Sequence, residues 1–248
     1  MKMLRITGCT DPSMWYAEKV GQLVPFEWEW PEEMMEIEMK ERPILFSAPM
    51  VRAILSGDKT QTRRAAKPVR HPDLGNIYDP GALVLEHEPQ HVIDRACPYG
   101  QPGDRLWVRE TYQHANSPHG PYETGCTCFY RADYWDDPHG MDGEKSPEGK
   151  YRTWIPSIHM PRAASRINLE VVHVRVERLQ AIKHVDCIAE GTPGGHGSSP
   201  GYPYAATPRE HYRHIWESIN GRGSWDANPW VWVVEFKKIQ TTEAGGLE

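Results

Sequence analysis

The sequence ILFSAPMVRAILSGDKTQTRR, residues 44–64, joins an apolar run, a helical pattern and a basic run without a break. Residues 43–47 are predicted to form a short strand. Ser47 can cap the helix that follows, and Pro49 suits a position in its first turn. Gly57 can end that helix, because glycine adopts the left-handed conformation common after a last helical turn. The segment therefore predicts a strand followed directly by a short helix.

The helix in this segment has one apolar face, formed by Met50, Ile54 and Leu55, and we expect that face to pack on a core. Residues 58–64, DKTQTRR, follow it and are polar and basic. They are predicted to form a loop or an entering strand that does not belong to the core.

Working outward, further strands are expected where apolar residues alternate or cluster between turns. They are 82–88, 91–96, 105–112, 166–179 and 230–239. The stretch 166–179 is the strongest of these and is long enough to be one bulged strand. Short helices are predicted at 184–191, which ends at Gly191, and at 208–219. Strands dominate without a regular strand–helix repeat, so the expected fold is α+β: a small mixed β-barrel with peripheral short helices and long loop insertions.

The chain divides by composition into three parts. Residues 1–42 are predicted to form a small N-terminal appendage, with a short strand near the start, and an acidic connector that includes a helix at 31–40. Residues 43–239 form the main domain. It carries turn-rich insertions at 114–150 and 193–208. Residues 240–248 form a tail.

The 248 residues carry a formal net charge of −6. This average hides two basic segments, 43–70 with a net charge of +5 and 151–185 with +4. Two interpretations stay open: one shared basic face for nucleic acid or another anion, or two separate solvated faces. No run of 18 apolar residues is present, so no membrane span is expected. Five cysteines are too few for a disulfide scaffold and predict a reduced, cytoplasmic protein.

Four segments, taken in order, resemble ASCH domains, small β-barrels related to the PUA fold. The first is 44–64, with a short helix before Gly-Asp-Lys-Thr-Gln-Thr and a basic residue. The others are PGDRLWVRE at 102–110, RVERLQAIKHVDCIAEG at 175–191 and WVWVVEFKK at 230–238. The resemblance covers 43–239 and is closest to the longer ASCH proteins carried by phages and prophages. It implies a location in the cytoplasm of a bacterial host.

Small bacterial ASCH proteins are amidohydrolases that remove the acetyl group from N4-acetylcytidine without a metal ion or cofactor. Their working set is a lysine, a threonine three residues further on and a glutamate from a later helix. By position, the resemblance implies Lys59, Thr62 and Glu190 as catalytic residues. Arg64 matches an arginine that contributes to the site in that group.

The chemistry of these residues can also be considered without the resemblance. Amide hydrolysis through a covalent intermediate needs a hydroxyl nucleophile, here Thr62, and a base that takes its proton. Lys59 can be that base only when neutral, so burial or the nearby cations Arg63 and Arg64 must lower its pKa from about 10.4. Glu190 could orient Lys59 or relay a proton, but its charge would raise the same pKa.

The same basic residues also fit an RNA- or DNA-binding module, with or without nuclease activity. In that interpretation the cations contact phosphates, and Thr60 and Thr62 add hydrogen bonds. The cations are Lys59, Arg63, Arg64, Lys67 and Arg70. Trp154 and Arg162 are candidates for base stacking and phosphate contact in either interpretation, with RNA expected before DNA. A third interpretation places Thr62 in an ordinary strand and Lys59 in solvent.

Cys126 and Cys128, with histidines nearby, raise the question of a zinc site. Their C-x-C spacing differs from the usual C-x(2–4)-C knuckle, and no second cysteine pair follows. The sequence therefore predicts no metal at this position.

Overall fold

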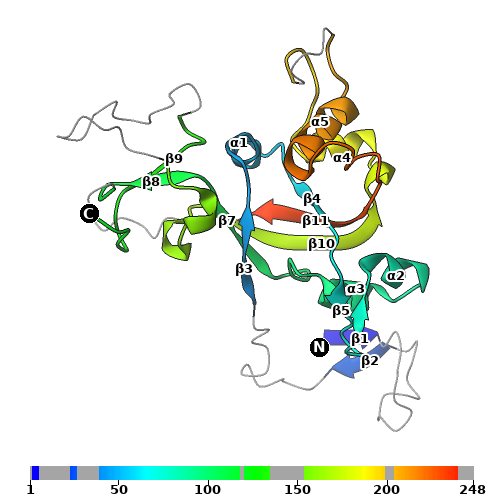
Figure 1. Cartoon of the computed structure of the whole chain (residues 1–248). Coiled ribbons are helices and arrows are strands. Elements are labelled where there is room, and N and C mark those ends of the chain that lie inside the picture. Colours follow the sequence, from blue (N-terminus) through cyan, green and yellow to red (C-terminus); the bar gives the residue numbers. More distant parts are fainter. Residues whose placement is uncertain are drawn as a thin grey trace, which may run out of the picture. The chain divides into compact units, whose positions relative to one another are not determined.

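The computed structural model describes residues 2–5, 23–26, 39–117, 120–134, 154–198 and 204–239 (Figure 1). The chain divides into two compact units, Met1–Met39 and Lys40–Glu248. In the first unit, β1 (Lys2–Arg5) pairs with β2 (Leu23–Phe26) in antiparallel orientation. Residues 31–38 of the predicted helix, the tail at 240–248 and parts of both insertions lie outside the described residues.

The second unit is built on a five-stranded mixed sheet with the order β3-β7-β10-β11-β4. β3 and β7 are parallel, and the other neighbours are antiparallel. The strands are β3 (Glu41–Leu45), β7 (Arg105–Arg109), β10 (Asn168–Arg178), β11 (Trp230–Lys238) and β4 (Gln61–Ala65). The helices are α1 (Ala48–Ser56), α2 (Pro80–Leu85), α3 (Gln90–Ala96), α4 (His184–Ala189) and α5 (Pro208–Asn220). The expected α+β class is therefore confirmed.

Smaller elements complete this unit. Two short hairpins are formed by β5 (Val69–Arg70) with β6 (Ile77–Tyr78), and by β8 (Tyr112–His114) with β9 (Cys128–Tyr130). Single 3-10 turns lie at Ser157–His159, Arg162–Ala164 and Leu179–Ala181. Within the turn-rich insertion predicted at 114–150, β9 pairs with β8.

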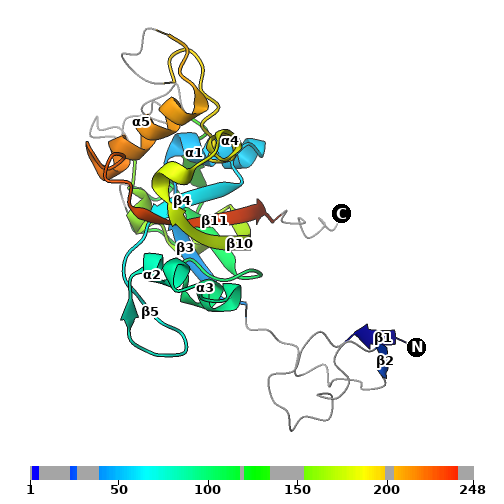
Figure 2. The ribbon, with the colours of Figure 1, turned by 90° about the vertical axis from the view of Figure 1, so that its right-hand side faces the viewer.

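The sheet separates two hydrophobic clusters, and alternate residues of β11 serve one or the other. Trp232, Val234 and Phe236 join the larger cluster, which includes the buried apolar residues of β3, β7, α1, α2 and α3. Val231 and Val233 join the smaller cluster with residues of α4 and α5. Figures 1 and 2 show α4 and α5 together beside β4 and β11, with α2 and α3 on the opposite side of β10 and β11.

The first segment forms the predicted strand and helix, with corrections in detail. β3 begins at Glu41, two residues before the predicted start, and α1 has its proline in the first turn as expected. Gly57 ends α1 with φ +89°, also as expected. Ser47 precedes α1 but makes no side-chain capping bond. The buried face is Val51 with Ile54, whereas Leu55 is exposed.

The prediction that residues 58–64 stay outside the core is wrong. Gln61, Thr62 and Arg63 lie in the edge strand β4 and are all at most 3% exposed. Polar composition suggested a solvated run. The side chains of Gln61 and Arg63 are nevertheless buried because their partners lie far away in the sequence: Gln61 Nε2 donates to the Asp186 carbonyl oxygen at 2.9 Å, and Arg63 pairs with Glu190 at 3.1 Å.

The stretches 82–88 and 91–96 were predicted as strands and are helical instead, in α2 and α3. Asp79 caps α2, accepting a bond of 2.8 Å from the Gly81 N–H, and Pro80 starts it. A short apolar run cannot distinguish a buried strand from one turn of buried helix by periodicity alone. For the first of these stretches, the Asp79 cap and Pro80 favour the helix.

The longest strand was predicted correctly. β10 covers 168–178, and its register with β11 shifts between Val171 and His173, which is the bulge that the sequence allowed. None of the helices among the described residues is both long and apolar enough to cross a membrane.

Candidate functional site

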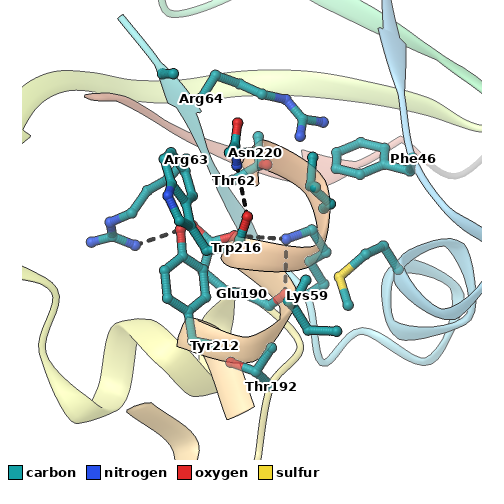
Figure 3. A pocket seen from close by; sticks show the side chains of 14 residues that line it. Phe46, Lys59, Thr62, Arg63, Arg64, Glu190, Thr192, Tyr212, Trp216 and Asn220 are labelled. Atoms are coloured by element: carbon teal, nitrogen blue, oxygen red, sulfur yellow. Dashed lines mark hydrogen bonds and ion pairs between the residues drawn. The ribbon is translucent and has the colours of Figure 1, made fainter. Parts of the chain in front are cut away.

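A pocket lies along the open edge of β4, between the helix that precedes this strand and α5 (Figure 3). The space between its walls is about 580 Å³, which includes open solvent at the mouth. β4, α5 and the end of α4 provide most of its lining. The lining residues are Phe46, Met50, Lys59, Thr62, Arg63, Arg64, Ala65, Glu190, Thr192, Tyr212, Ile215, Trp216, Ile219 and Asn220. The three residues implied as catalytic therefore share one pocket.

Lys59 is fixed at the floor of the pocket by three hydrogen bonds. Its Nζ lies 2.8 Å from the Gln61 carbonyl oxygen, 2.8 Å from the Glu190 carbonyl oxygen and 2.8 Å from Glu190 Oε2. The residue is 3% exposed. An ammonium group has three protons to donate, and all three have acceptors here. Lys59 is thus a buried partner of Glu190, not the solvated lysine of the third interpretation.

Burial also changes the acid–base behaviour of Lys59. Removal from water lowers the pKa of the Lys59 amine, and the cations Arg64 and Arg63 act in the same direction, whereas Glu190 opposes them. The net direction is downward. A lysine that gives up its proton more readily than usual is suited to act as a base.

The approach of Glu190 to Lys59 depends on the turn that ends α4. Glu190 caps this helix, and Gly191 follows it with φ +81°. A Cβ on Gly191 would lie 2.9 Å from the Ala53 Cβ and 3.4 Å from the Lys59 Cβ. Thr60 N–H donates to the Ala189 oxygen at 2.9 Å and ties the same turn to β4. Glycine is therefore required here for both conformation and space.

Arg63 holds the other oxygen of Glu190. Its Nη1 lies 3.1 Å from Glu190 Oε1, and its Nη2 lies 2.6 Å from Glu177 Oε1 and 3.3 Å from Asp186 Oδ2. The Arg63 side chain is fully buried. Arg175 extends the network, with its Nε 3.2 Å from Glu177 Oε2. Both Glu190 oxygens are thus bound by cations, which fixes the orientation of its carboxylate.

Thr62 and Arg64 lie on the face of β4 that meets Phe46. Thr62 is 2% exposed, and its hydroxyl group is not among the three acceptors that Lys59 Nζ binds. Arg64 donates from Nη2 to the Leu45 carbonyl oxygen at 2.6 Å, and its guanidinium carbon lies 5.1 Å from the Phe46 ring centre. Figure 3 shows Arg64 and Phe46 beside each other on one side of the pocket.

Helix α5 forms the opposite wall with Tyr212 and Trp216, which are 4% and 5% exposed. Its start is fixed by a capping box, in which Thr207 accepts from the Glu210 N–H and Glu210 accepts from the Thr207 N–H. The buried Trp216 indole N–H has no hydrogen-bond partner among the residues that the structure describes. Buried donors are rarely left in this state, so a ligand acceptor could meet it.

Three predicted binding residues do not line this pocket. Thr60 is exposed and contributes only backbone bonds. Trp154 lies beside Arg131, whose guanidinium carbon is 5.6 Å from its ring centre. Arg162 pairs with Glu41 at 3.0 Å. The predictions of Trp154 and Arg162 as binding residues used local composition, which cannot place distant segments in space.

The sequence reasoning missed both aromatic walls of the pocket. The helical spacing of residues 208–219 places Tyr212 and Trp216 on one apolar face with Ile215 and Ile219, a pattern typical of an ordinary core helix. The core covers only part of this face, because Tyr212 and Trp216 are buried whereas Ile219 is 63% exposed. An apolar helix face that is wider than packing on the core requires was the one feature of the sequence that pointed to a binding surface here. Phe46 gave no signal, because strand ends often carry a core aromatic residue.

Some cations of each basic segment pair with carboxylates. In the first, Lys59 and Arg63 are buried and paired. In the second, Arg162, Arg166 and Arg175 pair with Glu41, Glu110 and Glu177. Lys59 and Arg63, which are both buried and neutralised, are therefore poor phosphate contacts.

No cluster of three or more metal-ligating side chains occurs in the part of the chain that the structure describes. Cys126 and Cys128 are free thiols there, as are Cys97 and Cys187. Comparison with protein-family models, curated proteins and solved structures found no match to this chain.

Proposed function

We propose that this protein is a metal-independent amidohydrolase that removes the acyl group from an N4-acylated cytosine nucleoside or nucleotide, such as N4-acetylcytidine. The observation that carries the proposal is the Lys59–Glu190 pair, 2.8 Å apart, in a pocket that Thr62 also lines. A hydroxyl, an amine of lowered pKa and a fixed carboxylate are the groups that acyl transfer to a hydroxyl needs.

In the proposed first half-reaction, neutral Lys59 takes the proton of the Thr62 hydroxyl. A neutral amine has two hydrogens, so it gives up one of its three acceptors and gains a lone pair. The Thr62 oxygen attacks the acyl carbon and forms a tetrahedral intermediate. The bond from this carbon to N4 then breaks, and N4 takes the proton from Lys59. Cytidine leaves, and the acyl group remains as an ester on Thr62.

In the second half-reaction, water attacks the ester carbon and gives its proton to Lys59. The bond to the Thr62 oxygen breaks, this oxygen takes the proton back, and the carboxylic acid leaves. Glu190 keeps the Lys59 amine in place through both steps, and Arg63 keeps Glu190 in place. Arg64 supplies positive charge beside the negative oxygen that develops.

The proposal includes the ASCH/PUA-like barrel as the fold and the cytoplasm of a bacterial host as the location. A chain connection and a hydrogen bond support a sheet whose two outer strands, β3 and β4, approach each other as in a barrel. α1 links β3 directly to β4, which are the two ends of the sheet order, and Arg64 of β4 donates to Leu45 of β3.

Nucleic-acid binding, with RNA before DNA, is the competing function. It is less well supported because Lys59 and Arg63, two of the expected phosphate contacts, are at most 3% exposed.

The proposal is tested with two substitutions of the nucleophile. Thr62→Val removes the hydroxyl with little change of shape, and Thr62→Ser keeps it. We expect Thr62→Val to lose at least a hundredfold in kcat on N4-acetylcytidine and Thr62→Ser to keep measurable turnover. Mass spectrometry of quenched wild-type protein should find the acyl group on the peptide that contains Thr62. Equal rates for wild type and Thr62→Val would refute the role of Thr62.

A further inference from the structure

The open edge of β4 follows from its register with β11. Phe236 N–H donates to the Thr60 oxygen at 2.8 Å, and Ala66 N–H donates to the Trp230 oxygen at 2.9 Å. Both pairs are directly opposite each other in the β4–β11 register. In an antiparallel pair, hydrogen-bonded and non-hydrogen-bonded residues alternate. The even-numbered residues of β4 therefore turn their backbone groups toward β11.

The odd-numbered residues, Gln61, Arg63 and Ala65, turn their backbone N–H and C=O groups to the other side, which is the pocket side. An independent contact agrees with this, because Lys59 Nζ binds the Gln61 oxygen on that side. Among the described residues, none forms a hydrogen bond with the backbone N–H or C=O of Arg63 or Ala65 on the open edge. Both residues line the pocket.

The two aromatic walls stand on opposite faces of the sheet. Phe46 belongs to the larger core cluster with Trp232 and Phe236, and Trp216 belongs to the smaller cluster with Val233. Figure 3 shows Phe46 and Trp216 on opposite sides of the pocket. A flat ring that extended the plane of the sheet beyond β4 would therefore have an aromatic side chain on each face.

We infer that the open edge of β4 selects the base of the substrate by pairing with its Watson–Crick edge. This inference rests on the proposed function. The Arg63 carbonyl accepts from the exocyclic N4–H, and the Ala65 N–H donates to the ring nitrogen N3. Uracil has the opposite pattern, with an acceptor at position 4 and a donor at N3, and would leave both backbone groups without a bond. The base must also be unpaired, because this edge is used in a duplex.

The first test measures binding of cytidine and uridine to wild-type protein by titration calorimetry. Cytidine is the proposed product, so its binding does not depend on turnover. We expect cytidine to bind at least ten times more tightly than uridine, and N3-methylcytidine to bind at least ten times more weakly than cytidine. In amide-resolved NMR, the Ala65 N–H signal should shift when cytidine is added. Equal affinities for cytidine and uridine, or no binding of cytidine, would overturn the inference.

The second test removes one backbone donor. Ala65→Pro deletes the N–H on the open edge, where no ladder bond is lost and proline is tolerated in an edge strand. Ala65→Ser is the matched control, because it keeps the N–H. We expect Ala65→Pro to lower cytidine affinity about tenfold and to reduce the preference over uridine, while Ala65→Ser keeps both. A folded Ala65→Pro protein with the wild-type preference would contradict the inference. The nucleoside series on wild type decides the question if this variant does not fold.

These measurements distinguish failure of the proposed hydrolase function from failure of the proposed base recognition by β4. If cytidine is preferred but N4-acetylcytidine is not hydrolysed, the base-reading edge stands and the hydrolase function falls. If N4-acetylcytidine is hydrolysed but cytidine shows no preference over uridine, the hydrolase function stands and the base-reading edge falls.

Discussion

At the scale of single residues, the site depends on one carboxylate shared between two buried cations. Glu190 uses Oε2 for Lys59 and Oε1 for Arg63. The two contacts have different consequences. The contact with Lys59 places the proposed base, and the contact with Arg63 anchors the carboxylate to a network that includes Glu177 and Asp186.

The pH dependence of turnover should report on Lys59. Burial lowers the pKa of its amine, and the base must be neutral, so kcat/KM should rise with pH and level off at an inflection below about 10.4. Lys59→Arg should show no turnover at any pH, because a guanidinium group keeps its proton. Thr62→Ser should keep the inflection at the wild-type pH. A wild-type rate that falls with pH through this range would exclude Lys59 as the base.

Removing Arg63 should destabilise the fold. Arg63→Met leaves Glu177, Asp186 and Glu190 without their shared cation, and breaking a buried ion pair in this way costs about 3–5 kcal/mol. Urea unfolding of Arg63→Met should show a loss of this size. Lys67→Met, at an exposed position of the same segment, should stay within about 0.5 kcal/mol of wild type. Similar losses for both variants would show that the Arg63 network contributes little.

At the scale of elements, the site is where β4, α4 and α5 meet, and sequence reasoning predicted these elements unequally well. β10 and α5 were predicted because long periodic patterns identify them. β4 was missed as a core strand because its buried residues are polar, and their partners lie far away in the sequence. Lys59 and Glu190, for example, are separated by 131 positions. The resemblance to ASCH domains pointed to both residues, whereas the α5 wall was signalled only by the wide apolar face of that helix.

The turn after α4 gives a test at this scale. Gly191→Ala places a Cβ against Ala53 in a backbone conformation with φ +81°, so both strain and crowding are expected. Gly75→Ala is the matched control, because φ is +74° there and no atom lies within 4 Å of the added Cβ. The control should lose about 1–2 kcal/mol from strain. Gly191→Ala should lose about 1–3 kcal/mol more from overpacking and should also slow turnover. Equal stability and turnover of the two variants would contradict this account of the turn.

The capping box at the start of α5 gives a second test. Thr207→Ala removes the side-chain acceptor for the Glu210 N–H, which should cost about 1 kcal/mol in thermal or urea unfolding. Thr207→Ser keeps an equivalent oxygen and should stay close to wild type. If Thr207→Ala equals Thr207→Ser in stability, the capping box does not hold this wall of the pocket.

At the scale of the whole molecule, the second unit contains the pocket and the described hydrophobic clusters. The unit starts at Lys40, whose N–H donates to Asp104 Oδ1 at 3.1 Å. Sequence composition predicted that the main domain begins at residue 43, three residues after the start of this unit. It could not show that β3 begins at Glu41, because the residues before Pro43 are charged.

A chain of residues 40–248 should therefore fold alone. We expect it to have the melting temperature and the N4-acetylcytidine turnover of the full chain within experimental error. Circular dichroism melting and a turnover assay on both chains measure this directly. A shortened chain without a cooperative transition would mean that residues 1–39 are needed for folding of the second unit.

The most direct test of the central claim is to incubate folded wild-type protein with N4-acetylcytidine, without added metal ion, and to follow the products by chromatography. Our account predicts that cytidine and acetate appear in equal amounts over many turnovers, and that Lys59→Met, measured beside it, releases neither above background. N4-acetylcytidine that stays intact in the presence of folded wild-type protein would contradict the account.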